Sequence, residues 1–176
     1  MSRVMVDTNV LVYATRRPRA KDAPEVADLT RRAKHLIAKL DPIRISSISM
    51  LEFLRGLRAD EQEAGAELLS RTEAEAVDAV IATRANELLT RRVSSLPACA
   101  LCFNAKTAAT CKGCKRLVGA EQRLRDALIV ATADILRDVD VLYTFDGGVI
   151  AFGEDAKGVS IQRPDSADGP LFNPVD

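Results

Sequence analysis

The sequence predicts a single α/β domain in which helices pack on both faces of a mostly parallel sheet. Short apolar runs with strand character are separated by longer runs whose apolar residues recur at helical spacing. Strands that alternate with helices in this way favour parallel pairing, with a binding site at the carboxyl ends of the strands. The 176 residues suffice for one core of ordinary size, so two large domains are not expected. We expect the domain to cover residues 1–163.

The N-terminal half predicts two strands, each followed by helices. The strands are expected at residues 4–6 and 43–48, which are short and apolar. The helices are expected at residues 8–14, 25–40, 49–57 and 61–70. A charged loop that contains proline, residues 16–23, separates the first two helices. The carboxyl end of each strand therefore leads into a helix.

The C-terminal half predicts two helices and two strands around an insertion. The expected helices cover residues 76–93 and 117–137, and the expected strands cover residues 141–145 and 159–162. Pro97 ends the first helical pattern. The sequence Asp146-Gly147-Gly148 predicts a turn. Residues 164–176, which are rich in Pro and Gly and show little periodicity, are expected to form a loosely held tail.

Four acidic residues fall where their side chains are expected to share one crevice. Asp7 and Asp146 directly follow predicted strands, and Glu52 lies in the first turn of the helix after the second strand. Asp126 joins them if its helix begins at the same edge of the sheet. Taken singly, each acid also has a structural explanation, as a helix cap, a capping-box partner of Ser49, an exposed helix charge or a turn residue. The prediction therefore rests on the set.

Carboxylates gathered in one crevice predict bound divalent cations. Like charges held close together repel and take up protons unless cations intervene. Mg²⁺ and Mn²⁺ accept such oxygen ligands and also bind the oxygens of a phosphate. Two ions about 3.5–4 Å apart would activate the attacking water and stabilise the leaving oxygen when a phosphodiester is cut. Thr8, Asn9 and Thr144, which flank the acids, are expected to orient ligands or waters.

The sequence around the four acids resembles the PIN-domain family of nucleases, which includes the toxins of many prokaryotic toxin–antitoxin pairs. The matching segments occur in the family's order and are residues 4–11 (VMVDTNVL), 46–53 (SSISMLEF), 126–133 (DALIVATA) and 142–146 (LYTFD). The resemblance implies a PIN-like fold and an endoribonuclease that depends on Mg²⁺ or Mn²⁺. Its catalytic, metal-binding residues would be Asp7, Glu52, Asp126 and Asp146. It implies single-stranded RNA as the substrate, and it leaves open an antitoxin protein and a homodimer as partners.

Two features depart from the family pattern. Gly147 and Gly148 stand after the fourth acid, where a more charged loop is typical of the family. The fourth position, here Asp146, is also the most variable one in the family. The second departure is the cysteine-containing insertion, which ordinary toxins of the family lack.

The insertion, residues 97–116, holds all four cysteines as two Cys-x2-Cys pairs separated by eight residues. The cysteines are Cys99, Cys102, Cys111 and Cys114. Four thiolates suit tetrahedral Zn²⁺ and leave no position for a catalytic water, so we expect a structural zinc site. Iron binding and a redox role are the alternatives. Few large apolar residues lie between residues 105 and 115, so the metal would serve as the core of this segment.

Charge is unevenly distributed along a chain whose formal net charge is zero. Residues 84–125 hold nine Lys or Arg against two Glu, a surplus of seven positive charges that the rest of the chain offsets. Phosphate binding needs such a local cationic surface. The candidates for RNA contact in the insertion are Lys106, Lys112, Lys115 and Arg116, and a merely solvated charged surface is the alternative. His35, the single histidine, is assigned no role.

Function and location follow as expectations. No apolar run approaches membrane-spanning length and no leader-like stretch precedes Asp7, so we expect a cytoplasmic protein. The leading prediction is an RNA-cleaving enzyme, with the toxin of a toxin–antitoxin pair as one role. The alternative is a non-catalytic PIN-like module that binds RNA or protein through the zinc insertion. That alternative predicts no requirement for Mg²⁺ or Mn²⁺ and tolerance of Asp7→Asn.

Overall fold

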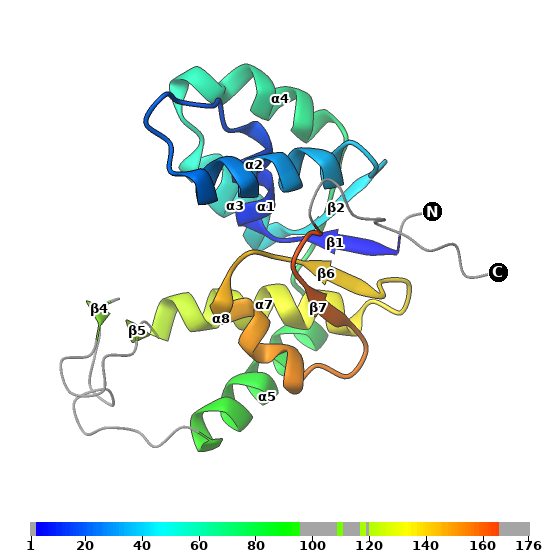
Figure 1. Cartoon of the computed structure of the whole chain (residues 1–176). Coiled ribbons are helices and arrows are strands. Elements are labelled where there is room, and N and C mark those ends of the chain that lie inside the picture. The colour runs from blue at the N-terminus through cyan, green and yellow to red at the C-terminus, as the bar shows by residue number, and fades with distance from the viewer. Residues whose placement is uncertain (1–2, 96–108, 111–116, 119, 166–176) are drawn as a thin grey trace.

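The computed structural model describes residues 3–95, 109–110, 117–118 and 120–165. Five strands form one sheet in the order β3-β2-β1-β6-β7, and every pair in it is parallel (Figure 1). The strands are β1 (Val4–Val6), β2 (Ile43–Ser46), β3 (Thr72–Glu75), β6 (Val141–Tyr143) and β7 (Ser160–Gln162). The predicted α/β class with a parallel sheet is confirmed.

Helices cover both faces of the sheet (Figure 1). One face carries α1 (Thr8–Thr15), α2 (Pro24–Ile37), α3 (Ser47–Gly56) and α4 (Gln62–Ser70), which the short turn η1 (Ala59–Glu61) precedes. The other face carries α5 (Ala79–Ser95), α7 (Ala120–Ile135) and α8 (Gly147–Ala151), which η2 (Phe152–Glu154) follows. Within the described ranges, no helix has the length and apolar character that crossing a membrane would require.

The central strand β1 contributes to two separate cores. Because side chains alternate along a strand, Val4 and Val6 face the layer of α1 to α4, where they join a buried cluster with Leu36. Met5 faces the opposite layer and joins a cluster with Leu88 of α5. All of these side chains are at most 5% exposed. The end of β1 therefore lies between two packed layers, where its position is fixed from both sides.

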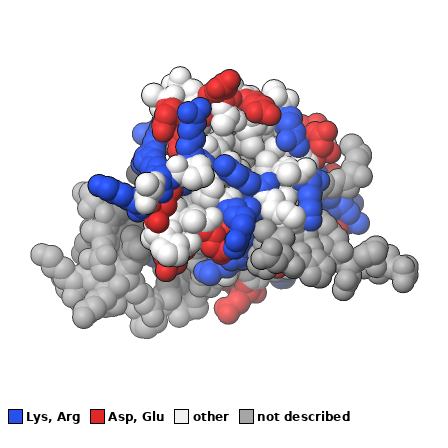
Figure 2. Space-filling model, turned by 45° about the horizontal axis from the view of Figure 1, so that its top comes forward, with Lys and Arg blue, Asp and Glu red and all other residues white. Residues whose placement is uncertain are grey.

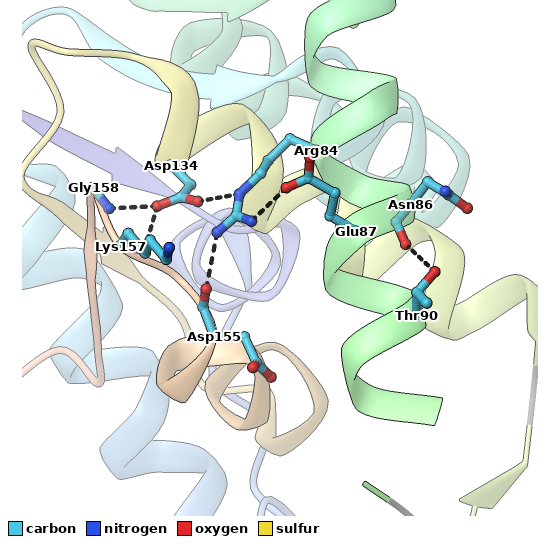
Figure 3. Close-up of polar contacts among 8 residues, drawn as sticks. All are labelled: Arg84, Asn86, Glu87, Thr90, Asp134, Asp155, Lys157 and Gly158. Atoms are coloured by element: carbon cyan, nitrogen blue, oxygen red, sulfur yellow. Dashed lines mark hydrogen bonds and ion pairs between the residues drawn. The ribbon is translucent and has the colours of Figure 1, made fainter. Parts of the chain in front are cut away.

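A buried ion pair holds the connection between α8 and β7 against the helices (Figure 3). Arg84 of α5 and Asp134 of α7 lie 2.6 Å apart, and their side chains are 10% and 3% exposed. The same guanidinium donates to the carbonyl oxygen of Asp155. Asp134 Oδ1 accepts hydrogen bonds from the amides of Lys157 (2.7 Å) and Gly158 (2.5 Å). The strand β7 is thereby positioned at the edge of the sheet.

The boundary between β2 and α3 differs from the prediction. The strand ends at Ser46, and α3 begins at Ser47 instead of Ser49. The reason is that Ser46 caps the helix, accepting a hydrogen bond at Oγ from the Ser49 amide (3.0 Å). The alternative explanation of Glu52 as the capping-box partner of Ser49 is therefore wrong. Glu52 lies in the second turn of α3, where its side chain is available for other contacts.

The strand β3 was not predicted, because its sequence, Thr-Glu-Ala-Glu, carries no apolar pattern. It lies at the edge of the sheet, where Glu73 and Ala74 are exposed and β2 supplies the pairing. The helix that follows begins at Ala79, three residues later than predicted. Asp78 explains the shift, since its Oδ1 accepts a hydrogen bond from the Ile81 amide (2.9 Å) as a helix cap does.

Two further boundaries near the C-terminal half differ from the prediction. Leu117 and Val118 form β5, which pairs antiparallel with β4 (Ala109–Thr110), so α7 begins at Ala120 and not at Leu117. The predicted turn after Asp146 is the first turn of α8, with Asp146 as its cap. Of the predicted loose tail, Pro164 is buried and its carbonyl oxygen accepts a hydrogen bond from Arg32 (2.6 Å), whereas residues 166–176 lie outside the described residues.

Candidate active site

A cavity of about 280 Å³ opens beside the carboxyl ends of the central strands β1 and β6. All four acids singled out in the sequence contribute to its wall. The lining residues are Asp7, Thr8, Asn9, Val12, Tyr13, Glu52, Gln122, Asp126, Ile129 and Asp146. The acids come from the start of α1, from α3, from α7 and from the start of α8, so residues far apart in the sequence meet at one place.

Asp7 is held by hydrogen bonds at both carboxylate oxygens. It follows β1 and caps α1, with Oδ1 accepting from the Thr8 amide (2.6 Å). Its Oδ2 accepts from the hydroxyl of Thr144 (2.7 Å) and from Asn9 Nδ2 (3.0 Å). The residue is 3% exposed. The orientation of this carboxylate is therefore set by the end of β6 as well as by its own helix.

The protonation of Asp7 reflects its surroundings. Burial raises the pKa of Asp7 from the ordinary value of 3.8 to about 6. The hydrogen bonds from Thr144 and Thr8 lower the pKa, and the negative charges of Asp146 and Glu52 raise it. The carboxyl therefore holds its proton more tightly than an exposed aspartate does. A nearby cation would lower the pKa again, because it favours the ionised form.

Thr144 and Asn9 connect β6 to α1 through side chains. The Thr144 hydroxyl donates to Asp7 and accepts from the Asp146 amide (2.9 Å), and it lies 3.3 Å from Asn9 Nδ2. Asn9 Oδ1 in turn accepts from the Phe145 amide (3.0 Å). Thr144 is fully buried. These bonds fix the chain that leads to Asp146 relative to Asp7.

Asp126 lies in the first half of α7, near the other acids. It is 4% exposed, and its Oδ1 accepts a hydrogen bond from Gln122 one turn earlier (2.9 Å). Burial raises the pKa of Asp126 to about 7, and the negative charge of Asp146 is the next largest cause. The hydrogen bond from Gln122 lowers the pKa, and the charges of Asp7 and Glu52 raise it further. The four carboxylates thus act on one another electrostatically.

Gly148 gives Asp126 and Asp146 room to approach each other. Its amide donates to Asp146 Oδ1 (2.6 Å). A Cβ at this position would lie 2.7 Å from Asp126 Oδ2 and 3.0 Å from Asp146 Oδ1. The first distance is shorter than ordinary contacts allow, so a side chain here would displace the carboxylate. The glycine is therefore required by the site and not by backbone conformation, since no described glycine has a positive φ.

Glu52 is held between α1 and α7. Its Oε2 accepts a hydrogen bond from the Thr8 hydroxyl (2.7 Å). Its Oε1 lies 3.3 Å from a guanidinium nitrogen of Arg125, the residue that precedes Asp126. The side chains of Arg125 and Glu52 are 33% and 20% exposed. Glu52 therefore faces the cavity with one neighbour that donates a neutral hydrogen bond and one that carries positive charge.

The donor set fits a hard divalent cation. It consists of carboxylates, and Asp7 and Asp126 are buried near like charges that a cation would neutralise. In the part of the chain that the structure describes, no three His, Cys, Asp or Glu side chains stand in an arrangement ready to hold an ion. Each oxygen of Asp7 and of Glu52 accepts at least one hydrogen bond. A carboxylate oxygen that accepts one hydrogen bond keeps a second lone pair, which can bind a cation.

Three contacts of the acids were not anticipated from the sequence. Gln122 lies four residues before Asp126, a spacing that places the two side chains together on a helix, so this partner was recognisable in principle. The contacts of Arg125 with Glu52 and of Gly148 with Asp126 arise from the packing of separate elements. No sequence signal identifies them.

The predicted zinc ligands and RNA contacts lie outside the described residues. They are Cys99, Cys102, Cys111, Cys114, Lys106, Lys112, Lys115 and Arg116. The described strands β4 and β5 pair in the register Ala109 with Val118 and Thr110 with Leu117. The chain thus enters and leaves residues 111–116, which contain one cysteine pair, through neighbouring strands.

Comparisons with known proteins agree with this geometry. The family described as PIN domain matches residues 4–154 of the chain. One similar solved structure is the crystal structure of VapBC2 from Rickettsia felis bound to a DNA fragment from their promoter. It has a TM-score of 0.51 and 21% sequence identity over 92% of this chain and 98% of that chain, a likeness of fold. No curated protein matches the chain. Since the matched segment includes helices α1 to α5, α7 and α8, four of the five strands of the sheet and all four acids, the chain belongs to the PIN domain family.

Proposed function

We propose that this protein is a metal-dependent nuclease that hydrolyses phosphodiester bonds in RNA. The observation that carries the proposal is that four carboxylates from four separate segments line one cavity. PIN domains are generally metal-dependent nucleases and typically use divalent ions such as Mg²⁺. Membership of the family and the chemistry of the cavity therefore favour the same activity.

The residues that would hold Mg²⁺ or Mn²⁺ are Asp7, Glu52, Asp126 and Asp146. When bound, the ions would supply an activated water and neutralise charge on the phosphate during in-line displacement. Thr144 would keep Asp7 in place through the bond to its Oδ2, and Thr8 would do the same for Glu52. The hydrogen bond from Thr144 lowers the pKa of Asp7, so it favours the ionised form that a cation needs.

RNA as the substrate is supported by the resemblance of the four acid-bearing segments to PIN ribonucleases. A labelled panel of single-stranded RNA and DNA of the same sequences tests both the activity and the choice of substrate. We expect wild type to cut RNA with Mn²⁺ or Mg²⁺ and to stop when a chelator is added. Asp126→Asn should lower the rate at least 100-fold, whereas Asp60→Asn, at an exposed position of η1, should not.

Cleavage that survives both chelation and Asp126→Asn would refute the proposal. Binding of RNA that is unchanged by Asp7→Asn, with no cleavage under any metal, would instead favour a non-catalytic binding module. The two results are distinguished by running binding and cleavage on the same protein preparations.

A role as the toxin of a toxin–antitoxin pair is favoured by a separate observation, the likeness to the VapBC2 structure. In this role an antitoxin protein would be the partner of the chain. Induced expression of wild type in a bacterial host should stop growth, and Asp126→Asn should not. Co-expression of the small protein encoded beside the gene should restore growth and co-purify with the chain. Normal growth on induction of an active enzyme would assign the nuclease to another role.

A further inference from the structure

A second hollow adjoins the carboxylate cavity. It has a volume of about 410 Å³ and is lined by Thr8, Ile48, Leu51, Glu52, Arg55 and Arg125. Thr8 and Glu52 line both hollows, so the two share a wall. A ligand that enters the carboxylate cavity can therefore extend into this second space, which we call the arginine groove.

One face of α3 forms most of the groove. Ile48, Leu51, Glu52 and Arg55 are spaced as one side of a helix, and α7 supplies Arg125 from across the groove. Leu51 is 54% exposed, although it is a large apolar residue. The groove thus combines two guanidinium groups with an uncovered apolar side chain. This combination suits a ligand that has both an anionic and an apolar part.

The arginine groove carries two positively charged side chains, whereas the cavity carries four carboxylates. Four carboxylates repel the phosphates of a nucleic acid on either side of the bond to be cut. Arg55 lies one turn beyond Glu52, and Arg125 lies 3.3 Å from the carboxylate of Glu52. Arg125 lines the groove with a side chain that is 33% exposed, and its guanidinium stays positively charged while it contacts Glu52, so it attracts a phosphate in the groove. The arginines therefore offer attraction where a neighbouring phosphate would lie.

The basic side chains of α2 are less suited to this task. The face on which α2 and α4 come forward shows Lys and Arg interspersed with Asp and Glu (Figure 2). On α2, Arg31 and Arg32 both lie within 3.5 Å of Asp28. Neither residue lines the carboxylate cavity. The arginine groove, in contrast, opens directly beside the acids.

We propose that Arg55 and Arg125 bind the phosphate next to the scissile one, with the apolar side of α3 supporting the attached sugar or base. This subsite rests on the proposed nuclease function, and it assigns the groove to the substrate strand and not to a protein partner. Arg55 and Arg125 thereby position the substrate, while the four acids carry the chemistry.

Kinetics of single-stranded RNA cleavage test the subsite. Arg55→Gln and Arg125→Gln should each raise KM about 3- to 10-fold, the size expected for one partly exposed charged hydrogen bond. For Arg55→Gln, kcat should stay within about twofold of wild type, because uniform binding affects KM alone. The slope of log KM against the logarithm of the salt concentration should decrease by about 0.7 for each phosphate contact removed. Arg58→Gln is the matched control, since Arg58 is exposed just after α3 and does not line the groove.

A chemical change in the substrate gives an independent test. An uncharged methylphosphonate placed at the linkage on one side or the other of the scissile bond should raise the wild-type KM by a similar factor. With that substrate, Arg55→Gln should add no further loss, because the charge it contacts is already gone. Thermal unfolding of each variant checks that the fold is intact.

The outcomes separate this subsite from the proposed function. Suppose that cleavage requires metal and Asp126, while both arginine variants have the KM and salt dependence of wild type. This result would overturn the subsite and leave the proposed nuclease function standing. A wild-type protein that cuts no nucleic acid would overturn the proposed function. In that case, fluorescence anisotropy of labelled RNA measures binding to the Asp126→Asn protein and to the same protein with Arg55→Gln or Arg125→Gln added. Equal RNA affinity of these proteins would overturn the subsite. If an arginine variant changes its mass in solution while its KM stays that of wild type, the groove is a protein contact. This result would also overturn the subsite.

Discussion

The hydroxyl of Thr144 donates a hydrogen bond to Asp7 across 137 positions of sequence, with 2.7 Å between Oγ1 and Oδ2. The bond joins the ends of the two central strands and fixes one oxygen of a buried carboxylate. Thr144 is itself fully buried and accepts a bond from the Asp146 amide. Two of the four acids therefore depend on one hydroxyl group for their positions.

Replacing this hydroxyl should weaken the site and the fold together. Thr144→Val keeps the shape of the side chain but removes one of the three hydrogen-bond donors to the buried Asp7, so the free energy of unfolding should fall by about 1–3 kcal/mol. The pKa of Asp7 should rise further, because the lost hydrogen bond lowers it. Thermal unfolding and NMR titration measure the two effects. Thr144→Ser is the control that retains the hydroxyl, and equal behaviour of Ser and Val variants would contradict the assigned role.

Stability of the metal-free protein should depend on pH in a defined direction. The folded pKa values of Asp7 and Asp126 are raised to about 6 and about 7, from an ordinary value of 3.8. Between about pH 4 and 7 the unfolded chain releases protons that the folded chain retains, so the free energy of unfolding falls as pH rises. The loss from Asp7 is on the order of 2–3 kcal/mol at 1.36 kcal/mol per pKa unit.

Denaturant unfolding in the presence of chelator, at several pH values, measures this effect. Asp126→Asn should be more stable than wild type at pH 8 and similar to it at pH 4, because the amide cannot ionise. Added Mg²⁺ or Mn²⁺ should stabilise wild type and have less effect on the variant. A wild type that gains stability from pH 5 to 8 without metal, relative to the variant, would contradict the prediction.

Gly148→Ala should impair the site with little effect on the fold. The new Cβ would lie 2.7 Å from Asp126 Oδ2, so one or both carboxylates must move. We expect at least a 10-fold fall in cleavage rate, of the size that displaced catalytic groups produce, and weaker stabilisation by metal. Gly147→Ala is the matched control, because a Cβ there meets nothing within 4 Å. Equal activity of the two variants would show that the carboxylates tolerate displacement.

Removing one partner of the buried Arg84–Asp134 pair should destabilise the protein strongly. Arg84→Met leaves Asp134 buried without its charge partner, which typically costs about 3–5 kcal/mol. The control is Arg31→Met, since Arg31 is 59% exposed and its pair with Asp28 should contribute little. Chemical denaturation of the three proteins gives the comparison. A loss below about 1 kcal/mol would mean that the network around Asp134 is satisfied in another way.

The four cysteines of residues 97–116 should bind one zinc ion per chain. Elemental analysis of protein purified without added metal should give about one equivalent of zinc, and Cys99→Ser or Cys114→Ser should lower it. Because a closed zinc site is structural, cleavage should need added Mg²⁺ or Mn²⁺ even in the zinc-loaded protein. Iron in place of zinc, or disulfides with no metal, would support one of the alternatives for this segment.

The sequence was informative where local chemistry determines structure. The apolar run before Asp7 predicted β1 at its observed bounds, and helical spacing predicted α2 and α5 to within a few residues. It failed at β3, whose polar residues at the sheet edge carry no strand pattern, and at α8, where Asp146-Gly147-Gly148 suggested a turn. Short elements of this kind depend on the neighbours against which they pack.

The same distinction applies to the site. The four acids were recognisable because the short segments that carry them resemble family segments and occur in the family's order. Their partners Arg125 and Gly148 were not, because these contacts depend on how α3, α7 and α8 pack together. A sequence can suggest which residues approach one edge of a sheet, whereas the contacts between their side chains require the packed structure.

The separation of Asp7 and Thr144 along the chain also has a consequence during synthesis. A ribosome adds Thr144 137 positions after Asp7, and the fourth acid follows two positions later. Until then the first carboxylate has neither its hydroxyl partner nor the second wall of its cavity. An unfinished chain should therefore be unable to cut nucleic acid beside the ribosome that makes it.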